Sequence, residues 1–220
     1  MNEAQFLKET ESHVMEVVRD DGLYRHIRFR KPGTMYEHFD LITWPGYLCY
    51  CGDMGTYVFS RLDDMFQFFR TDREYAQKNG RQLSINIGYW AQKLQAVDGN
   101  RHKASAMEFD EDKFRRAINE YRIKWMRDAK AEKLLDESER RDLWEAVDDQ
   151  VLGELDNGGE RAMYAAYDFS WSAYMSSRRW YFEDLFERDF QKYTHHFTWC
   201  CYALAWGVQQ YDASKQAVAS

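Results

Sequence analysis

FDLITWPGYLCYCGDMGTYVFS, residues 39–60, contains three short runs rich in aromatic and β-branched residues, separated by turn signals. The runs are Phe39–Trp44, Tyr47–Cys51 and Thr56–Ser60, and their residue types are favoured in strands. Pro45 and Gly46 fit the central positions of a type II turn, and residues 52–55 form a second short connection. Because short turns join neighbouring strands antiparallel, this stretch predicts an antiparallel meander.

The residues before this stretch predict one more strand and a helix. Tyr24–Arg30 alternates apolar and basic residues, as a half-exposed strand does. Residues 3–19 place apolar side chains such as Leu7 and Val14 at helical spacing, and Gly22 follows as a stop signal. An N-terminal helix and a four-stranded sheet are therefore expected.

The residues after the meander favour helices. A helical period runs from Leu83 to Val97, and from Asp110 onward apolar stripes at helical spacing predict helices only, the last from about Tyr181 to Tyr211. The sequence thus predicts an α+β fold. Residues 1–100 contain the antiparallel sheet and residues 108–220 form a helical bundle, and the two regions pack as one compact unit.

Composition narrows the class of protein. The chain has 220 residues, 17% of them aromatic, which predicts a large aromatic core. The N-terminus lacks the basic start and apolar run of a signal peptide, and no apolar stretch reaches the roughly 20 residues that span a bilayer. We therefore expect a cytoplasmic protein, without membrane insertion, whose four cysteines are free thiols.

Negative charge is concentrated in one segment. The net charge is −7, while residues 131–160 contain eleven acidic and three basic residues, a charge of −8. Such a field repels nucleic acid, so direct nucleic-acid binding is not expected, and it attracts basic surfaces.

The acidic segment has two interpretations. It is either a solvated helix exterior, or a row of carboxylates that mimics a phosphate backbone and docks against a basic surface. Neighbouring tyrosines and tryptophans exceed what one core face needs, and both types are favoured at interfaces, including those of homodimers. The candidate partner-binding residues are Glu137, Glu139, Asp142, Glu145, Asp148, Asp149, Tyr164 and Trp171.

No pattern predicts a catalytic residue, a cofactor or a metal site. Cys49, Cys51, His196 and Cys200 could close a zinc site if strand and helix met, but their spacing matches no common zinc motif, and ordinary buried or free thiols are the alternative.

Two further hypotheses concern ligands. His38, Asp53 and Arg61 could serve a nucleotide or another small ligand, in an enzyme or a binding protein, at a site between sheet and helices. Arg25, Arg28 and Arg30 form a basic strip that could contact nucleic acid, although four bases against an acidic whole favour a solvated strand face.

The segment from Phe39 to Arg70 resembles a family of uncharacterised bacteriophage and prophage proteins. The resemblance rests on the pieces TWPG, CGDMGTYVFSR and DMFQFFR, and it covers about the first half of the chain. It implies an accessory protein made in the cytoplasm of the host cell, and it transfers no catalytic residue.

This context suggests stoichiometric binding to host machinery. We therefore expect an anti-defence protein, most concretely an inhibitor of a CRISPR–Cas complex, whose partner is a host protein or ribonucleoprotein with a basic surface.

Overall fold

The computed structural model describes residues 1–34, 36–70, 73, 78–98 and 105–219. The chain forms two compact units. Unit 1 consists of residues 1–107 and 193–220, and unit 2 consists of residues 108–192. The chain leaves unit 1 through β7 (Met107–Phe109) and returns through β8 (Gln191–Tyr193), and these two short strands pair with each other.

Unit 1 is built on a six-stranded antiparallel sheet with strand order β1-β2-β3-β4-β5-β6, in which every strand pairs with its neighbours along the chain. The meander follows from the short turns, with Gly46 and Gly55 both at positive φ. The strands are β1 (Val14–Asp21), β2 (Tyr24–Arg30), β3 (Phe39–Trp44), β4 (Tyr47–Gly52), β5 (Gly55–Ser60) and β6 (Leu94–Val97).

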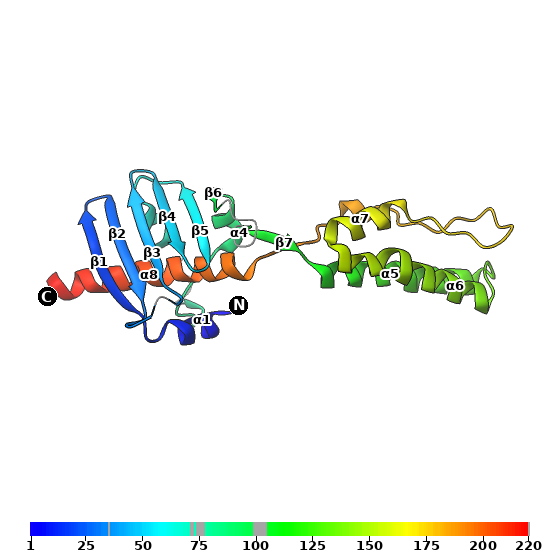
Figure 1. Ribbon diagram of the computed structural model, residues 1–220, viewed down its shortest axis with the longest axis horizontal. Coiled ribbons are helices and arrows are strands. Elements are labelled where there is room, and N and C mark those ends of the chain that lie inside the picture. The colour runs from blue at the N-terminus through cyan, green and yellow to red at the C-terminus, as the bar shows by residue number, and fades with distance from the viewer. Residues whose placement is uncertain (35, 71–72, 74–77, 99–104, 220) are drawn as a thin grey trace. The chain divides into compact units, whose positions relative to one another are not determined.

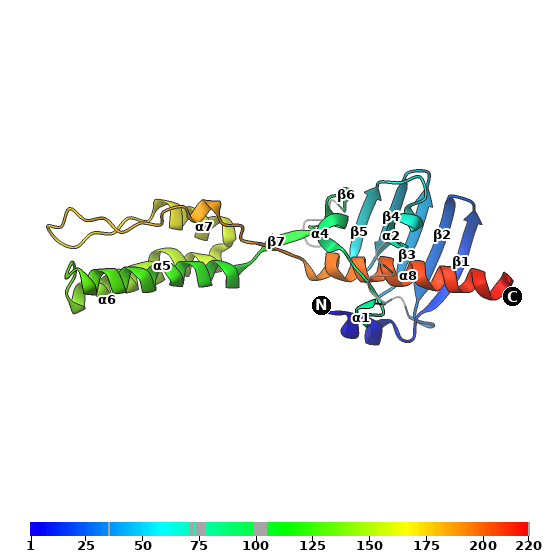
Figure 2. The same ribbon diagram turned by 180° about the vertical axis from the view of Figure 1, so that it is seen from behind.

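One face of the sheet is covered by helices. Alternate residues such as Phe29, Leu41 and Tyr50 are fully buried, and α8 (His195–Ala219) runs across the strands against them (Figures 1 and 2). Gly207 allows this close approach, since a Cβ there would lie 2.8 Å from Leu41 Cδ1. The same core includes side chains of α1 (Glu3–Thr10), α2 (Met65–Arg70) and α4 (Ile87–Ala91).

The α+β class is confirmed, and the four predicted strands are β2 to β5. Two predicted helices were wrong in part. Residues 3–19 form α1 and then β1, and residues 83–97 contain α4 and then β6. In both places a free edge of the meander offered backbone hydrogen bonds, and pairing with that edge outweighed the helical spacing of the apolar residues.

Unit 2 is mainly helical. Two long helical runs and one shorter helix surround a core that includes Phe114, Trp125, Leu143 and Phe182. In this unit the second run widens from α to π geometry after Val147 and then tightens to 3₁₀ geometry. The elements are α5 (Glu111–Ala131), α6 (Glu137–Val147), η1 (Asp148–Leu152), η2 (Gly153–Asn157), α7 (Gly159–Asp168) and η3 (Leu185–Glu187).

The prediction of continuous helix after Asp110 was wrong between α7 and α8. Phe169 to Phe190 is mostly extended, and Trp171 and Trp180 exchange two backbone hydrogen bonds of 3.0 Å and 2.8 Å. Trp180 and Phe182 pack against Trp125 of α5 from this non-helical segment. The regular spacing of aromatic residues here therefore reflects their burial and does not indicate a helix.

The division of the chain also differs from the predicted one. The C-terminal helix belongs to unit 1, although the sequence placed it with residues 108–220. The reason is that Phe197, Leu204 and Val208 of α8 bury their side chains against the sheet. Of the predicted helical region 108–220, only residues 108–192 form a unit of their own.

Candidate functional site

Unit 2 carries the acidic charge of the molecule. Its 85 residues (108–192) include 22 acidic and 15 basic side chains, a net charge of −7 that equals the charge of the whole chain. Unit 1 is therefore electrically balanced. The net negative charge that would attract a basic partner at long range therefore lies on unit 2.

The helical run α6–η1 presents part of the predicted acidic row to solvent. Asp142, Glu145 and Asp149 are spaced by three and four residues and are all exposed, as is Glu137 one turn earlier. Among the described residues none of these four carboxylates has a hydrogen-bonded or ion-paired partner. Arg141 lies four residues after Glu137 and four before Glu145, and it is exposed.

The other two predicted carboxylates have structural partners. Glu139 accepts a hydrogen bond from the backbone N–H of Asp136 at 2.8 Å and so completes the capping box that begins α6. Asp148 accepts two hydrogen bonds from the guanidinium of Arg122, at 2.8 Å and 2.7 Å. Glu139 and Asp148 therefore differ from the four unpaired carboxylates of the predicted set.

Exposed aromatic side chains gather on the same unit. Tyr164 and Tyr167 of α7 are 71% and 70% exposed, and Tyr174 in the extended segment is 92% exposed. Met175 beside it is 89% exposed and has a positive φ of 57°. Tyr is among the residue types that contribute most binding energy at protein interfaces, so these exposed rings are candidate anchors.

Trp171, the other predicted aromatic anchor, has a different role. It is partly buried, packs against the core of unit 2 and pairs with Trp180 through the backbone. It holds the two arms of the extended segment together. The sequence could not separate it from Tyr164, because both residues fit one helical stripe.

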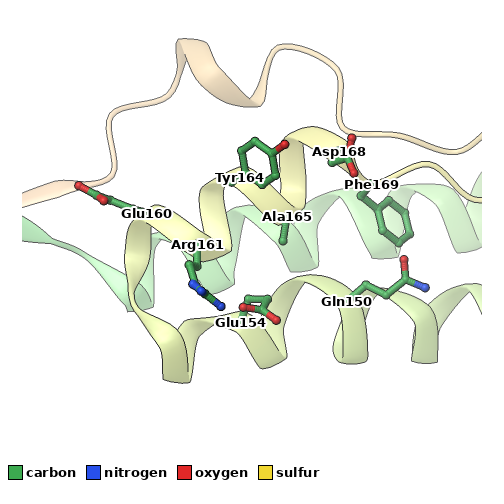
Figure 3. Close-up of a pocket in the computed structure, with 8 residues that line it drawn as sticks. All are labelled: Gln150, Glu154, Glu160, Arg161, Tyr164, Ala165, Asp168 and Phe169. Atoms are coloured by element: carbon green, nitrogen blue, oxygen red, sulfur yellow. The ribbon is translucent and has the colours of Figure 1, made fainter.

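A groove lies between η1–η2 and α7 (Figure 3). Its volume is about 640 Å³. Arg161 of α7 and Glu154 of η2 point toward one another across it, and Tyr164 lies on the same helix (Figure 3). Three carboxylates and one guanidinium line it, so the groove is acidic. The lining residues are Gln150, Glu154, Glu160, Arg161, Tyr164, Ala165, Asp168 and Phe169.

The alternative ligand site is only partly assembled. His38 Nδ1 lies 3.1 Å from a carboxylate oxygen of Asp53, beside a hollow of about 980 Å³ between the loops at one end of the sheet. Arg61 follows Ser60, which pairs with Tyr47 at the opposite end of β4. The structure therefore separates Arg61 from His38 and Asp53.

The predicted basic strip is neutralised within unit 1. Arg25 is buried on the helix-covered side and bonds to Asp64 at 2.8 Å and 3.2 Å. Arg28 bonds to Asp40 through two 3.0 Å hydrogen bonds. Arg30 lies 3.3 Å from Glu16. Each guanidinium already has a carboxylate partner, which removes the reason to assign phosphate contacts to these residues.

The four residues considered for zinc do not come together. Cys49 and Cys51 alternate with the fully buried Leu48 and Tyr50, so their side chains leave β4 on the side away from α8. Cys200 is buried in the core with α8. Among the described residues, no group of three or more potential ligands is placed to hold a metal ion.

Comparisons with protein-family models, with curated proteins and with solved structures found no match to this chain. Within the described part of the chain, no helix has the length and apolar character needed to cross a membrane.

Proposed function

We propose that this chain is a binding protein that inhibits a host defence complex, and that unit 2 is its partner-binding module. The observation that carries the proposal is the coincidence, on one unit, of four unpaired carboxylates with tyrosines that are more than two-thirds exposed. The phage context and the specific case of an anti-CRISPR protein rest on the resemblance of residues 39–70. The partner is a host protein or ribonucleoprotein with a basic surface.

The carboxylates and the tyrosines contribute to binding in different ways. Carboxylates of the free acidic face, defined as Glu137, Asp142, Glu145 and Asp149, attract a basic partner at long range and speed the encounter. Desolvated tyrosines then hold the complex, because Tyr has a large apolar ring and few rotatable bonds. The acidic groove beside Tyr164 suits a Lys or Arg side chain of the partner, whose cation can lie over the ring.

The central experiment reverses the charge of Asp142, Glu145 and Asp149 to Lys. Glu137 is left unchanged, because it lies in the first turn of α6, where a positive charge would oppose the helix dipole. The matched control reverses Glu11, Asp21 and Asp63, three exposed acids of unit 1, and changes the net charge equally.

Each variant is used as bait in host lysate and in a plating assay with phage on a CRISPR-defended host. The parent and the control should retain one partner and protect the phage, and the unit 2 variant should lose both. Binding of the purified pair should also weaken as salt rises. If the unit 2 variant retains partner and protection, the acidic face is not the binding surface.

The aromatic contribution has its own test. Tyr164→Ser and Tyr174→Ser remove exposed rings of unit 2, and Tyr36→Ser removes a ring of unit 1 that is 82% exposed. The unit 2 substitutions should raise the dissociation rate of the complex with little effect on the association rate. Equal dissociation rates for all three variants would contradict the assignment.

The hollow beside His38 and Asp53 supports a second candidate function, that of a small-ligand-binding protein. A thermal-shift screen with nucleotides on the parent and on His38→Ala tests it. Stabilisation of the parent alone would favour this function over partner binding.

A further inference from the structure

The extended segment of unit 2 ends in a tip, residues 172–179, that is basic although the unit is acidic. The tip contains Arg178 and Arg179 and no acidic residue. The rest of unit 2 contains 22 acidic and 13 basic residues, a net charge of −9. Both arginines are exposed, and within the described part of the chain neither guanidinium has a carboxylate partner. The tip therefore carries a charge of +2 that its own unit does not neutralise.

Contacts at its base order the tip before it meets any partner. Trp171 and Trp180 exchange their two backbone hydrogen bonds there, and the N–H of Ser176 donates to the carbonyl of Ala173 at 3.0 Å, which closes the turn. The guanidinium carbon of Arg178 lies 5.3 Å from the centre of the Trp180 ring. Because the backbone is already ordered, docking of the tip costs less conformational entropy than docking of a free loop.

Apolar side chains lie beside the two arginines. Tyr174 and Met175, at the turn, are 92% and 89% exposed, more than the other large hydrophobic residues in the described part of the chain. Tyr, Met and Arg are enriched at protein interfaces relative to the rest of a protein surface. The tip therefore has both the charge and the apolar groups of a docking element.

The groove between η1–η2 and α7 has the opposite charge (Figure 3). Its volume of about 640 Å³ can accept side chains of a partner. Glu160 and Asp168, near the two ends of α7, are exposed and have no partner among the described residues. Tyr164 lies between them and is 71% exposed. With Glu154 and Arg161 included, the lining carries a charge of −2, equal and opposite to that of the tip.

The tip cannot enter the groove of its own chain. Phe169 lines the groove and begins the extended segment, so the segment starts at the edge of the groove. From there it runs on past the end of α7 (Figures 1 and 2). Ring contacts of Phe169 and Trp180 with Trp125 of α5 fix that direction. The tip and the groove can therefore meet only when they belong to different copies of the chain.

We propose that the chain forms a homodimer in which the tip of each copy docks into the groove of the other copy. The exchange is reciprocal, so two copies form a closed pair with two identical contacts. Arg178 and Arg179 face the carboxylates of the groove, and Tyr174 and Met175 cover the exposed Tyr164 ring. Two charged contacts and two apolar ones recur on each side of the pair.

The dimer forms without a host protein, so the inference does not rest on the proposed function. It does cover Tyr164 and Tyr174, two of the rings assigned to the host partner. A host protein that uses these rings must first separate the two copies. The free acidic face lies outside the lining of the groove and stays open in the dimer.

Sedimentation equilibrium of the purified full-length chain, over a range of micromolar concentrations, measures the dimer. The tip variant is Arg178→Glu with Arg179→Glu, and the groove variant is Glu160→Lys with Asp168→Lys. Each should raise the dissociation constant of the dimer about tenfold or more, because both contacts then join like charges. Lys at the first turn and Lys at the last residue of α7 have opposite effects on the helix dipole, so α7 should stay folded.

The decisive sample is a mixture of the tip variant and the groove variant. In the mixture an acidic tip meets a basic groove, and a basic tip meets an acidic groove. A heterodimer should form although each variant alone is monomeric, and added salt should weaken it. Misfolding of either variant cannot produce this rescue.

Two control variants separate the dimer from other effects of charge. Arg115→Glu with Arg116→Glu, an exposed adjacent pair on α5, changes the net charge as the tip variant does and should leave the dimer intact. Reversal of Asp142, Glu145 and Asp149 should abolish binding of the host partner without weakening the dimer. The two proposals can therefore fail independently.

Three results would overturn the inference. The first is a parent chain that stays monomeric at every concentration. The second is a dimer that neither the tip variant nor the groove variant weakens. The third is a mixture of the two variants, both folded by their melting curves, that forms no heterodimer.

Discussion

Arg122 of α5 binds Asp148 of η1 through two hydrogen bonds, of 2.8 Å and 2.7 Å, and its guanidinium lies 3.6 Å from the centre of the Trp144 ring. The Arg122 side chain is 3% exposed and that of Asp148 is 49% exposed. This pair removes one carboxylate from the acidic face. It also ties α5 to the point where α6 changes to π geometry.

Asp148→Ala should destabilise the protein, because the buried Arg122 cation loses its carboxylate partner and keeps only its hydrogen bonds to Asn119 Oδ1 and the Trp144 carbonyl. Hydrogen bonds to a charged group are worth about 1.5–3 kcal/mol. The measurement is urea unfolding followed by circular dichroism. Asp149→Ala, a neighbouring exposed acid without a described partner, is the matched control and should change the free energy of unfolding little. Equal changes in the free energy of unfolding would show that the pair between Arg122 and Asp148 does not stabilise the protein.

Acid should destabilise unit 1 through its paired carboxyl groups. Burial raises the pKa of Asp40, but hydrogen bonds from Arg28 and His26 outweigh it, and the net pKa is below the ordinary value of 3.8. The pKa values of Asp20 and Asp64 are lowered as well. A group with a lowered folded pKa contributes stability that is full above its unfolded pKa and is lost as the pH falls through the folded one.

The urea midpoint should therefore hold between pH 7 and pH 5 and fall as the pH drops below about 4. Asp40→Asn should be less stable than the parent at pH 7 but should lose less on acidification. Asp63→Asn, at an exposed position, should follow the parent at every pH. A parent midpoint that is unchanged down to pH 3 would contradict this account.

Gly207→Val should strain the contact between α8 and the sheet. A Cβ at this position would lie 2.8 Å from Leu41 Cδ1 and 3.2 Å from Phe29 Cε2. Overpacking of this kind costs about 1–3 kcal/mol, which thermal unfolding detects as a lower Tm. Ala213→Val, on the exposed side of the same helix, separates this strain from the lower helix propensity of Val. The packing argument fails if both substitutions lower the Tm equally.

Trp125→Ala should release the extended segment between α7 and β8. The centre of the Trp125 ring of α5 lies 4.9 Å from that of Phe182, 6.1 Å from that of Trp180 and 6.2 Å from that of Phe169. Removing it costs about 3–5 kcal/mol, and trypsin should cut faster in the segment, where Arg178 and Arg179 are exposed. Ile123→Ala, 43% exposed on the same helix, should leave the cleavage rate unchanged. Identical cleavage of all three proteins would mean that the ring cluster does not anchor the segment.

The sequence predicted some elements well because their signals are local. Each strand of β2 to β5 has its own β-branched and aromatic residues and a turn at each end, and these need no distant partner to be recognised. Val14 to Asp21 lacked such a pattern. All but one of its residues are exposed, and it became a strand because β2 offered a free edge.

For the candidate site, the sequence located the acidic helix and Tyr164 but could not select among the acids. Asp142, Glu145 and Asp148 are acidic residues at the same helical spacing, so the sequence does not distinguish them. Only packing showed that Arg122, 26 residues before Asp148, reaches one of them. The groove beside Tyr164 was not predicted, because it depends on how η2 and α7 approach each other.

The sequence by itself determined the antiparallel meander, the helical character of α5 and α6 and the concentration of acid in residues 131–160, because turn chemistry, periodicity and charge are properties of neighbouring residues. Tertiary structure alone decided that α8 belongs with the sheet, which carboxylates remain unpaired, and that Cys49 and Cys51 lie on the uncovered face. Those outcomes depend on contacts between residues far apart in the chain, whose free energies a local pattern does not contain.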